Sequence, residues 1–453
     1  MNNHPVMWSL VTALGIQPSD LVALVGGGGK SSLMFSLAEE WDGVVLTTTT
    51  RIFTEQMKNA PAVCVLKNDS TLGVSDNFCL SEALRNNGRC LVIGTLKGEK
   101  AHGVSAEVPM EILDRKDVTL VVVEADGSRM KPCKAPAEHE PVLPVGTSLV
   151  VPVVGIDAAG YRIDQVCHRP ERVSDVTGLK ESELLSASAM ATLLTHARGG
   201  LKNVPQNSKV VAFINKVETE ERVVSARTIA KEALHEDRLS RVVLGKVKSQ
   251  NKVVEVHRRV TAIVLAAGES VRMGDVKQLL PWGESTVLGT TLGNLKSSGV
   301  HDILLVTGYE AEEVERIGNE QDVSTIYNPD YSDGEMLSSL KVAIRSLPDN
   351  REAILVVLAD QPMVDSGTID QILIAFWQGN GELIAPAYNK KRGNPVLIGR
   401  RLFSDFLSLP HGAAPRDLLS KKADALQLIP VNTPTILYDL DSPQDYETWR
   451  PGN

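Results

Sequence analysis

The chain has 453 residues, which exceeds the usual size of one hydrophobic core and predicts two or three domains. Its composition, with 43% hydrophobic and 23% charged residues, is typical of a soluble globular protein. The formal net charge of −9 argues against a nucleic-acid binder, whose binding surface would be basic. No apolar run reaches the roughly 18 residues that a membrane-spanning helix requires, so we expect no membrane segment.

The first residues, MNNHPVMWSLVTALGI, lack a cationic leader and a sustained apolar core. We therefore predict no signal peptide and a cytoplasmic protein. The five cysteines have no metal-type spacing, and we expect reduced thiols. All of them precede residue 170, and this asymmetry indicates a chain made of two modules. They are Cys64, Cys79, Cys90, Cys133 and Cys167.

The first strong pattern is an apolar run over residues 21–25, followed by four glycines, a lysine and two serines. This order is that of a phosphate-binding loop, because the amides around Gly28 and Gly29 would surround phosphates and Lys30 would neutralise them. Ser31 is the predicted Mg²⁺ ligand at the start of the following helix. The common motif has a further glycine where this chain has a leucine. The alternative is a flexible glycine turn with a solvated lysine.

Polar side chains also follow two later apolar runs. Residues 47–50 are four threonines that precede Arg51, and the run that ends near residue 123 leads into Glu124 and Asp126. Ligands of open α/β sheets bind at the carboxyl ends of the strands, so we expect these groups near the glycine loop. Asp126 is the predicted Mg²⁺ ligand, held directly or through water. Each residue alone would also suit an ordinary turn, but their recurrence favours a site.

The segment FINKVE is similar to the element with which many GTPases read guanine. Asn215 and Lys216 are its predicted nucleotide contacts. Glu218 replaces the usual aspartate, so ATP and GTP both remain open for this half. His139 and His168 lie among charged residues and are either structural residues or catalytic groups.

Together these pieces resemble the YqeC family of accessory proteins for selenium-dependent hydroxylases. The resemblance is carried by VGGGGKSS, TTTTR, VEADGSR, KAPAEHEPVLP and HRPE, and it covers most of residues 15–250. It implies a nucleotide-binding role in the maturation of molybdenum hydroxylases, which would be the client proteins. It does not supply a reaction for this half of the chain.

The junction between the two halves is basic and has no helical periodicity. We place the boundary near residue 255, in the segment LGKVKSQNKVVEVHRR. This predicts a P-loop-like α/β domain over residues 1–255 and a second domain over residues 256–453.

The second half opens with a buried strand pattern that runs into small residues and then a polar loop. Small residues let a nucleotide approach the backbone closely, and two cations of the loop, Arg272 and Lys277, are placed to neutralise its phosphates. An ordinary glycine-rich turn is the alternative. The nucleotide-binding residues predicted at this turn are Leu265, Ala266, Ala267 and Gly268.

Three later segments supply further polar groups. Ser338 and Ser339 fall in the first turns of a predicted helix, where they are either nucleotide contacts or ordinary caps. Asp360 follows an apolar strand pattern and is predicted to hold Mg²⁺ against the triphosphate. Asp439 and Asp441 are both options for the second metal ligand, and we favour Asp441.

The signature LAAGESVRMG with Lys277, together with ADQP, KKRGNPVLI and DLDSP, resembles the MobA-like nucleotidyltransferases, and most closely the molybdenum cofactor cytidylyltransferases. The resemblance runs over nearly all of residues 260–450 and implies a Rossmann-like α/β/α sandwich. The implied reaction joins CTP to the phosphate of the molybdenum cofactor (molybdopterin) and releases pyrophosphate. Arg272, Lys277 and Asp360 would be the catalytic groups with Mg²⁺, and Arg416 is a further anion contact.

Two alternatives accompany this prediction. The sequence LAAG is that of the cytidylyl branch, and the methyl group of Ala267 leaves less room for a larger base, so CTP is favoured over GTP. The other alternative is a non-catalytic cofactor carrier with a nucleotide-gated switch, against which the retention of Lys277 and Asp360 counts. The combined prediction is a transferase fused to a nucleotide-binding accessory domain.

Overall fold

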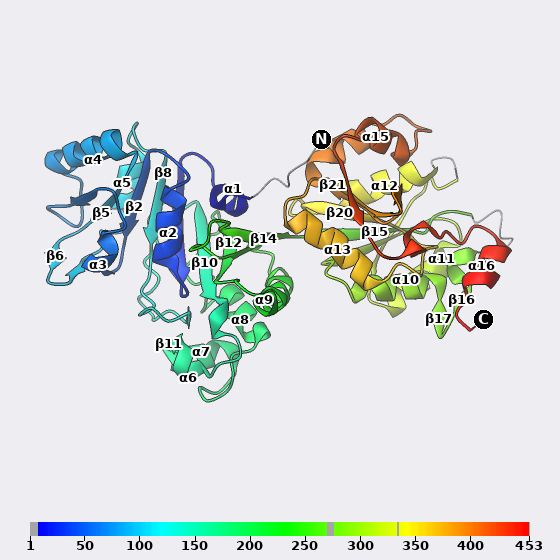
Figure 1. The fold of residues 1–453 in the computed structure, drawn as a ribbon, viewed down its shortest axis with the longest axis horizontal. Helices are drawn as coiled ribbons and strands as arrows, with labels where there is room; N and C mark the ends of the chain where they lie inside the picture. Colours follow the sequence, from blue (N-terminus) through cyan, green and yellow to red (C-terminus); the bar gives the residue numbers. More distant parts are fainter. Residues whose placement is uncertain (1–7, 270–275, 333–334, 453) are drawn as a thin grey trace. The chain divides into compact units, whose positions relative to one another are not determined.

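The computed structural model describes residues 8–269, 276–332 and 335–452. These residues form two compact units, one over residues 8–257 and one over residues 258–452 (Figure 1). Within the described ranges, no helix has the length and apolar character needed to cross a membrane.

The N-terminal unit is built on a nine-stranded sheet with the order β14-β13-β12-β10-β1-β8-β2-β5-β4. The pairings from β13 through to β4 are all parallel. The strands of this sheet are β1 (Asp20–Gly26), β2 (Val44–Thr48), β4 (Val63–Val65), β5 (Arg89–Ile93), β8 (Leu120–Glu124), β10 (Leu149–Gly155), β12 (Lys209–Asn215), β13 (Leu239–Gly245) and β14 (Val253–Arg258). Shorter strands are β3 (Ile52–Phe53), β6 (Leu96–Lys97), β7 (Lys100–Ala101), β9 (Cys133–Lys134) and β11 (Cys167–His168).

Helices connect these strands, as parallel pairing requires. They are α1 (Leu10–Leu14), α2 (Lys30–Ala38), α3 (Thr54–Met57), α4 (Val74–Asn87), α5 (Val108–Leu113), α6 (Ile163–Val166), α7 (Pro170–Thr177), α8 (Ala187–Thr195) and α9 (Glu220–Ala233). The central strand β1 is buried on both faces. Val22 and Leu24 pack with α2, whereas Ala23 and Val25 belong to a separate cluster on the opposite face. This explains why β1 reads as a continuous apolar run.

One expectation about the cysteines was wrong. Cys64 of β4 and Cys79 of α4 form a disulfide, with their Cα atoms 6.1 Å apart, whereas we expected reduced thiols throughout. The parallel sheet and its covering helix bring the two residues together, and their spacing along the sequence gave no sign of this proximity. Cys90, Cys133 and Cys167 are free and buried.

The C-terminal unit has an eight-stranded sheet with the order β19-β18-β15-β20-β23-β21-β22, in which β24 also pairs with β21. The pairings of β15 with β18 and β20 are parallel, and β23 is antiparallel to β20 and β21. The strands are β15 (Val260–Leu265), β18 (Asp302–Thr307), β19 (Ser324–Tyr327), β20 (Ala353–Leu358), β21 (Leu383–Tyr388), β22 (Lys391–Arg392), β23 (Val396–Gly399) and β24 (Leu426–Pro430). A separate hairpin consists of β16 (Pro281–Trp282) and β17 (Ser285–Thr286).

Helices cover both faces of this sheet, so the unit is the predicted three-layer α/β/α sandwich (Figure 1). Alternate residues of β15 face opposite layers: Val264 packs with Leu292 of α10, whereas Ile263 packs with Leu340 of α12. The helices are α10 (Val287–Lys296), α11 (Ala311–Glu320), α12 (Glu335–Ser346), α13 (Ser366–Trp377), α14 (Phe403–Leu407), α15 (Pro415–Lys421) and α16 (Pro443–Trp449).

Candidate functional sites

The N-terminal site begins where β1 runs through the glycine loop into α2. Gly26 and Gly28 have φ angles of +95° and +81°, a region that residues with side chains rarely adopt. A Cβ atom on Gly28 would lie 2.1 Å from the backbone nitrogen of Gly155. Glycine is therefore required there by conformation and by packing. The N–H groups of Gly27 and Gly28 donate to the carbonyls of Val153 and Lys131, so they are not available to a phosphate as the sequence predicted. The N–H groups at the start of α2 have no acceptor within the helix and are the ones suited to an anion.

Lys30 is the first residue of α2 and is only 2% exposed. Its Nζ donates to the carbonyl of Gly26 at 2.6 Å and lies 3.1 Å from Asp126 and 3.6 Å from Glu124. Burial lowers the pKa of Lys30, but the two carboxylates outweigh this effect and the pKa is raised above its ordinary value. Lys30 is therefore a fixed cation against the glycine loop.

The two carboxylates that follow β8 have different surroundings. The hydroxyl of Ser31 donates to Glu124 at 2.7 Å, and both residues line the same cavity. Asp126 is almost fully buried, accepts the N–H of Gly26 at 3.1 Å and pairs with Lys30 and Lys134. The structure thus brings Glu124, and not Asp126, next to Ser31. The sequence placed both carboxylates at this strand end and named Asp126 as the Mg²⁺ ligand, whereas the structure sets Asp126 between Lys30 and Lys134.

Asn215, at the end of β12, is buried and contacts the glycine loop. Its Nδ2 donates to the carbonyl of Gly28 at 2.8 Å, and its Oδ1 accepts the backbone N–H groups of Lys216 at 2.8 Å and Val247 at 3.3 Å. The ammonium of Lys216 pairs with Asp157 at 2.6 Å. Asn215 therefore holds the glycine loop, a role that the prediction of a nucleotide contact did not include.

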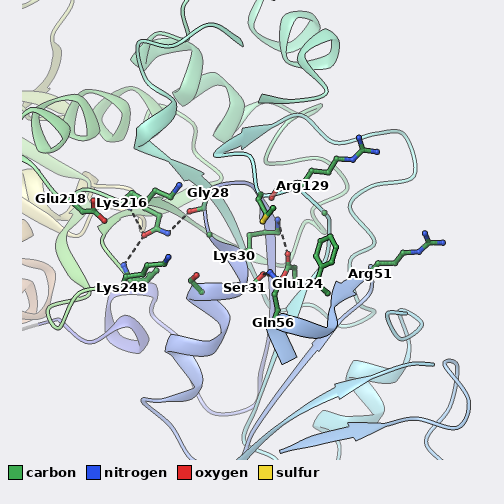
Figure 2. A pocket seen from close by; sticks show the side chains of 18 residues that line it. Gly28, Lys30, Ser31, Arg51, Gln56, Glu124, Arg129, Lys216, Glu218 and Lys248 are labelled. Atoms are coloured by element: carbon green, nitrogen blue, oxygen red, sulfur yellow. Dashed lines mark hydrogen bonds and ion pairs between the residues drawn. The ribbon is translucent and has the colours of Figure 1, made fainter. Parts of the chain in front are cut away.

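The glycine loop opens on a cavity of about 510 Å³ (Figure 2). Figure 2 shows charged side chains at two opposite ends of this cavity, with the residues of the loop and β8 between them. The three groups are Lys216, Glu218 and Lys248 at one end, Arg51 and Arg129 at the other, and Lys30, Ser31 and Glu124 between them. This arrangement fits an elongated, anionic ligand.

A network of buried charges continues from Asp126. Lys134 pairs with Asp126 at 3.1 Å and with Glu140 at 2.7 Å, and Arg169 pairs with Glu140 at 2.6 Å. Burial raises the pKa of Glu140, but hydrogen bonds from Lys134 and Arg169 outweigh it and hold the pKa at about 2. Burial and the nearby cations Arg169 and Lys134 lower the pKa of His168 to about 4, so its imidazole is neutral at pH 7.

The C-terminal site lies at the carboxyl end of β15 and β20. The register of these parallel strands pairs Leu265 with Leu358, so both strands end at the same edge of the sheet. Leu265 ends β15, Ala267 and Gly268 follow it, Asp360 follows β20, and all four line a cavity of about 420 Å³. The turn and the carboxylate predicted from sequence therefore meet in one cavity.

The remaining residues of the predicted turn behave differently. The backbone N–H of Ala266 donates to the carbonyl of Val306 at 3.0 Å, and the residue is buried away from the cavity. A Cβ atom on Gly268 would meet no described atom within 4 Å. As far as the described residues go, the space beside Gly268 is open.

Lys277 lies between two carboxylates of this cavity. Its Nζ contacts Asp360 and lies 3.2 Å from Asp441. Burial lowers the pKa of Lys277, but Asp360 and Asp441 outweigh this effect and the pKa is raised. Arg272, the other predicted cation of the loop, lies outside the described residues.

Three carboxylates line the cavity, Asp360, Asp439 and Asp441, with Lys277 as their neighbouring cation. Burial, and then the negative charge of Asp360, raise the pKa of Asp439, whose Oδ1 accepts a hydrogen bond from Gln361 at 2.5 Å. Among the described lining residues the carboxylates outnumber the cation, and their oxygen atoms fit a divalent cation such as Mg²⁺. Across the described residues, however, no group of three or more His, Cys, Asp or Glu side chains is arranged around a metal position. Because Lys277 contacts both Asp360 and Asp441, a metal ion bound to these two carboxylates would require Lys277 to shift.

The two predicted serines of α12 differ in position. Nδ2 of Asn328 donates to the hydroxyls of Ser338 at 2.8 Å and Ser339 at 3.0 Å. Ser339 is buried and lines the cavity, whereas Ser338 does not line it and its hydroxyl donates to the carbonyl of Asp330 at 3.3 Å. The sequence did not point to Asn328, which read only as part of a turn before proline.

A second cavity, of about 320 Å³, adjoins the first and shares Met336 and Leu358 with it. Its floor is mostly apolar, and three polar side chains, Arg392, Asn394 and Arg416, line it. Arg416 is the anion contact predicted from sequence. The two adjoining cavities together have room for two reactants.

Comparison with known proteins matches two parts of the chain to different families. Residues 22–171 match the family described as YqeC protein, and residues 262–426 match the MobA-like NTP transferase domain. The uncharacterized protein YqeC of Escherichia coli (strain K12) is 33% identical over 217 residues, which cover 46% of this chain and 80% of that protein.

Two similar proteins match the second half. The molybdenum cofactor cytidylyltransferase of Escherichia coli (strain K12) is 32% identical over 191 residues, which cover 42% of this chain and 94% of that protein. A solved structure of a nucleotidyl transferase from Methanothermobacter thermautotroptrophicus is 25% identical, covers 43% of this chain and 97% of its own, and has a TM-score of 0.38. The chain therefore belongs to the YqeC family over its N-terminal part and to the MobA-like nucleotidyltransferase family over its C-terminal part.

Proposed function

We propose that the C-terminal unit transfers CMP from CTP to the phosphate of the molybdenum cofactor and releases pyrophosphate. The observation that carries this proposal is the meeting of the small-residue turn, Lys277 and Asp360 in one cavity at the ends of β15 and β20. The similarity to a molybdenum cofactor cytidylyltransferase supports the choice of acceptor. The N-terminal unit then acts as a nucleotide-binding accessory domain in the maturation of selenium-dependent molybdenum hydroxylases.

The chemistry of such a transfer requires positioning more than proton transfer. The attacking phosphate oxygen is already ionised at neutral pH, so the site has to bring two anions together and neutralise the leaving pyrophosphate. Lys277 supplies a permanent positive charge for this purpose, and Arg272 a second one. A Mg²⁺ ion held by Asp360 and Asp441 would supply further charge neutralisation at the triphosphate.

The second cavity supports a separate place for the acceptor. Arg392 and Arg416 are suited to an anionic group, because a guanidinium binds phosphate through two parallel hydrogen bonds. The apolar floor is suited to a planar ring system. Asn394 occupies the position where the family usually has histidine, and here it would contribute amide hydrogen bonds.

Choice of the base rests on Ala267, which lines the cavity next to Gly268. Its methyl group occupies space that a glycine would leave to a purine, so CTP is the proposed substrate and GTP the competing one. The decisive experiment incubates the purified full chain with molybdenum cofactor, Mg²⁺ and either CTP or GTP, and follows the dinucleotide product and pyrophosphate. Product with CTP alone supports the proposal.

Asp360→Ala tests the site, and Asp424→Ala is its matched control, because Asp424 is exposed and does not line either cavity. We expect Asp360→Ala to lower the rate by about 100-fold or more, since several kcal/mol of charge stabilisation depend on this carboxylate. Product with GTP instead would assign the chain to guanylyl transfer. No product with either nucleotide would refute the transferase proposal and favour a cofactor carrier.

The N-terminal part of the proposal has its own test. Binding of Mg²⁺-ATP and Mg²⁺-GTP is measured by calorimetry on the full chain and on Lys30→Ala, with Lys97→Ala as the exposed control outside the cavity. Because the C-terminal unit also binds nucleotides, the difference between these variants reports the N-terminal site. Loss of one binding event in Lys30→Ala alone is the expected result, and identical isotherms would refute it.

A further inference from the structure

The cavity of the N-terminal unit extends in two directions from the phosphate loop. Asn215, Lys216 and Glu218 lie on one side of Lys30, and Arg51 and Arg129 lie on the opposite side (Figure 2). A single nucleotide that places its phosphates at the glycine loop and its base towards Lys216 leaves the arginine side uncovered. The two arginines therefore call for a separate explanation.

The backbone before Arg51 is fastened to the end of β8. The hydroxyl of Thr48 donates to the carbonyl of Glu124 at 2.9 Å, and the N–H of Thr49 donates to the same carbonyl at 3.2 Å. The N–H of Thr50 donates in turn to the hydroxyl of Thr48 at 3.1 Å. Arg51 thus follows a turn whose backbone is held beside Glu124, the carboxylate that contacts Ser31.

The backbone around Arg129 is fastened to the phosphate loop itself. The N–H of Gly28 donates to the carbonyl of Lys131 at 3.1 Å, and the N–H of Lys131 donates to the carbonyl of Ser128 at 3.0 Å. Arg129 and Met130 both have positive φ angles, +48° and +61°, which residues other than glycine rarely adopt. The surrounding structure must therefore maintain this backbone conformation. The backbone of Arg129 is therefore held next to the loop, and the residue lines the cavity.

The two guanidinium groups differ from Lys30 and Lys216, two other cations of this site. Lys30 pairs with Asp126, and Lys216 pairs with Asp157. Within the described ranges, neither Arg51 nor Arg129 has a hydrogen bond or ion pair with another protein group. Isolated exposed arginines are ordinarily solvated surface residues, but these two line one cavity, on the same side of the same phosphate loop, from two anchored turns.

From this arrangement we infer that the N-terminal unit has a second subsite, formed by Arg51 and Arg129, for a small molecule that carries a phosphate or carboxylate group beside the bound nucleotide. Guanidinium groups bind both kinds of anion through paired hydrogen bonds. The inference rests on the proposed nucleotide site of this unit. It makes the unit a site for two ligands instead of a switch that responds to one.

The test measures whether an anion binds together with the nucleotide. The full chain is saturated with Mg²⁺ and ADP or GDP, whichever it binds, and titrated with inorganic phosphate or, separately, with acetate. The variants are Arg51→Ala/Arg129→Ala, the lysine pair Arg51→Lys/Arg129→Lys, and the control Arg85→Ala, an exposed arginine of α4 that does not line the cavity. The C-terminal unit is the same in all variants, so any anion binding by that unit cancels when the variants are compared.

We expect the double alanine variant to bind the preferred anion at least about tenfold more weakly, since charge-assisted hydrogen bonds are lost, with nucleotide affinity within about twofold of the unchanged chain. The lysine pair should retain part of the affinity, and the control all of it. The anion whose affinity falls more in the double alanine variant, phosphate or acetate, identifies the class of ligand.

Two outcomes would overturn the inference, and they are distinguishable. If nucleotide binds normally and is weakened by Lys30→Ala, but both anions bind equally to all variants, the second subsite is refuted and the nucleotide site remains. If no nucleotide binds to the N-terminal unit at all, the proposed nucleotide site fails and the inference fails with it.

Discussion

Asn215→Ala is the substitution that best separates a residue that holds the phosphate loop from one that reads a base. In the structure this buried side chain makes three hydrogen bonds, to the carbonyl of Gly28 and to the N–H groups of Lys216 and Val247. Alanine would leave all three backbone groups without this partner. At about 1 kcal/mol for each lost bond, we expect the N-terminal unit to lose about 3 kcal/mol of its free energy of unfolding.

Loss of the contact with Gly28 also loosens the phosphate loop. Because this loop would bind the phosphates of any nucleotide, we expect ATP and GTP affinities to fall together, by about tenfold, which corresponds to one lost hydrogen bond of about 1.4 kcal/mol. Urea unfolding followed by circular dichroism measures the first effect, and calorimetric titration measures the second. Asn207→Ala, an exposed asparagine in the same unit, is the matched control.

Asn215→Asp sharpens the test. Its carboxylate keeps the acceptor for Lys216 and Val247, but it places an acceptor against the carbonyl of Gly28 in place of the amide donor. We expect a loss of affinity for both nucleotides in this variant as well. A selective loss of GTP binding, with ATP binding unchanged in both variants, would refute the reasoning and restore Asn215 as a guanine contact.

Three further predictions follow from other contacts. Asp360→Asn removes the charge that faces Lys277, so nucleotidyl transfer should fall by about 100-fold or more while the thermal unfolding midpoint changes little; an active variant would contradict the proposed site. The pKa of Glu140 is held at about 2, below its ordinary value, so the ionised carboxylate contributes up to about 3 kcal/mol to the free energy of unfolding above pH 5. This contribution is lost as the pH falls from about 4.5 towards 2. Glu140→Gln should flatten that part of the pH–stability curve, and an unchanged curve would exclude the contribution. Thiol titration in denaturant without reductant should find three reactive groups, and five after reduction, because Cys64 and Cys79 are bonded; five before reduction would contradict the disulfide.

Local patterns in the sequence were sufficient for the architecture of both halves. Continuous apolar runs that alternate with helical patterns predict parallel sheets covered by helices, and both units have them. The glycine loop before Lys30 and the small-residue turn before Lys277 were recognisable because backbone conformation and close approach restrict which residues fit. The expectation that polar groups gather at strand ends also follows from the sequence, since parallel strands end at one edge of the sheet.

Partners within each site were decided by the tertiary structure alone. Sequence placed Glu124 and Asp126 at one strand end, but only the fold sets Glu124 beside Ser31 and Asp126 among buried cations. The same holds for Asn215, which contacts a loop 187 residues away in the sequence. A local pattern reports the conformation and burial of a segment, whereas strand order and side-chain direction decide which distant group fills the remaining space. Short-range sequence therefore determined what kinds of sites this protein has, and the packing of distant segments determined which residues form them.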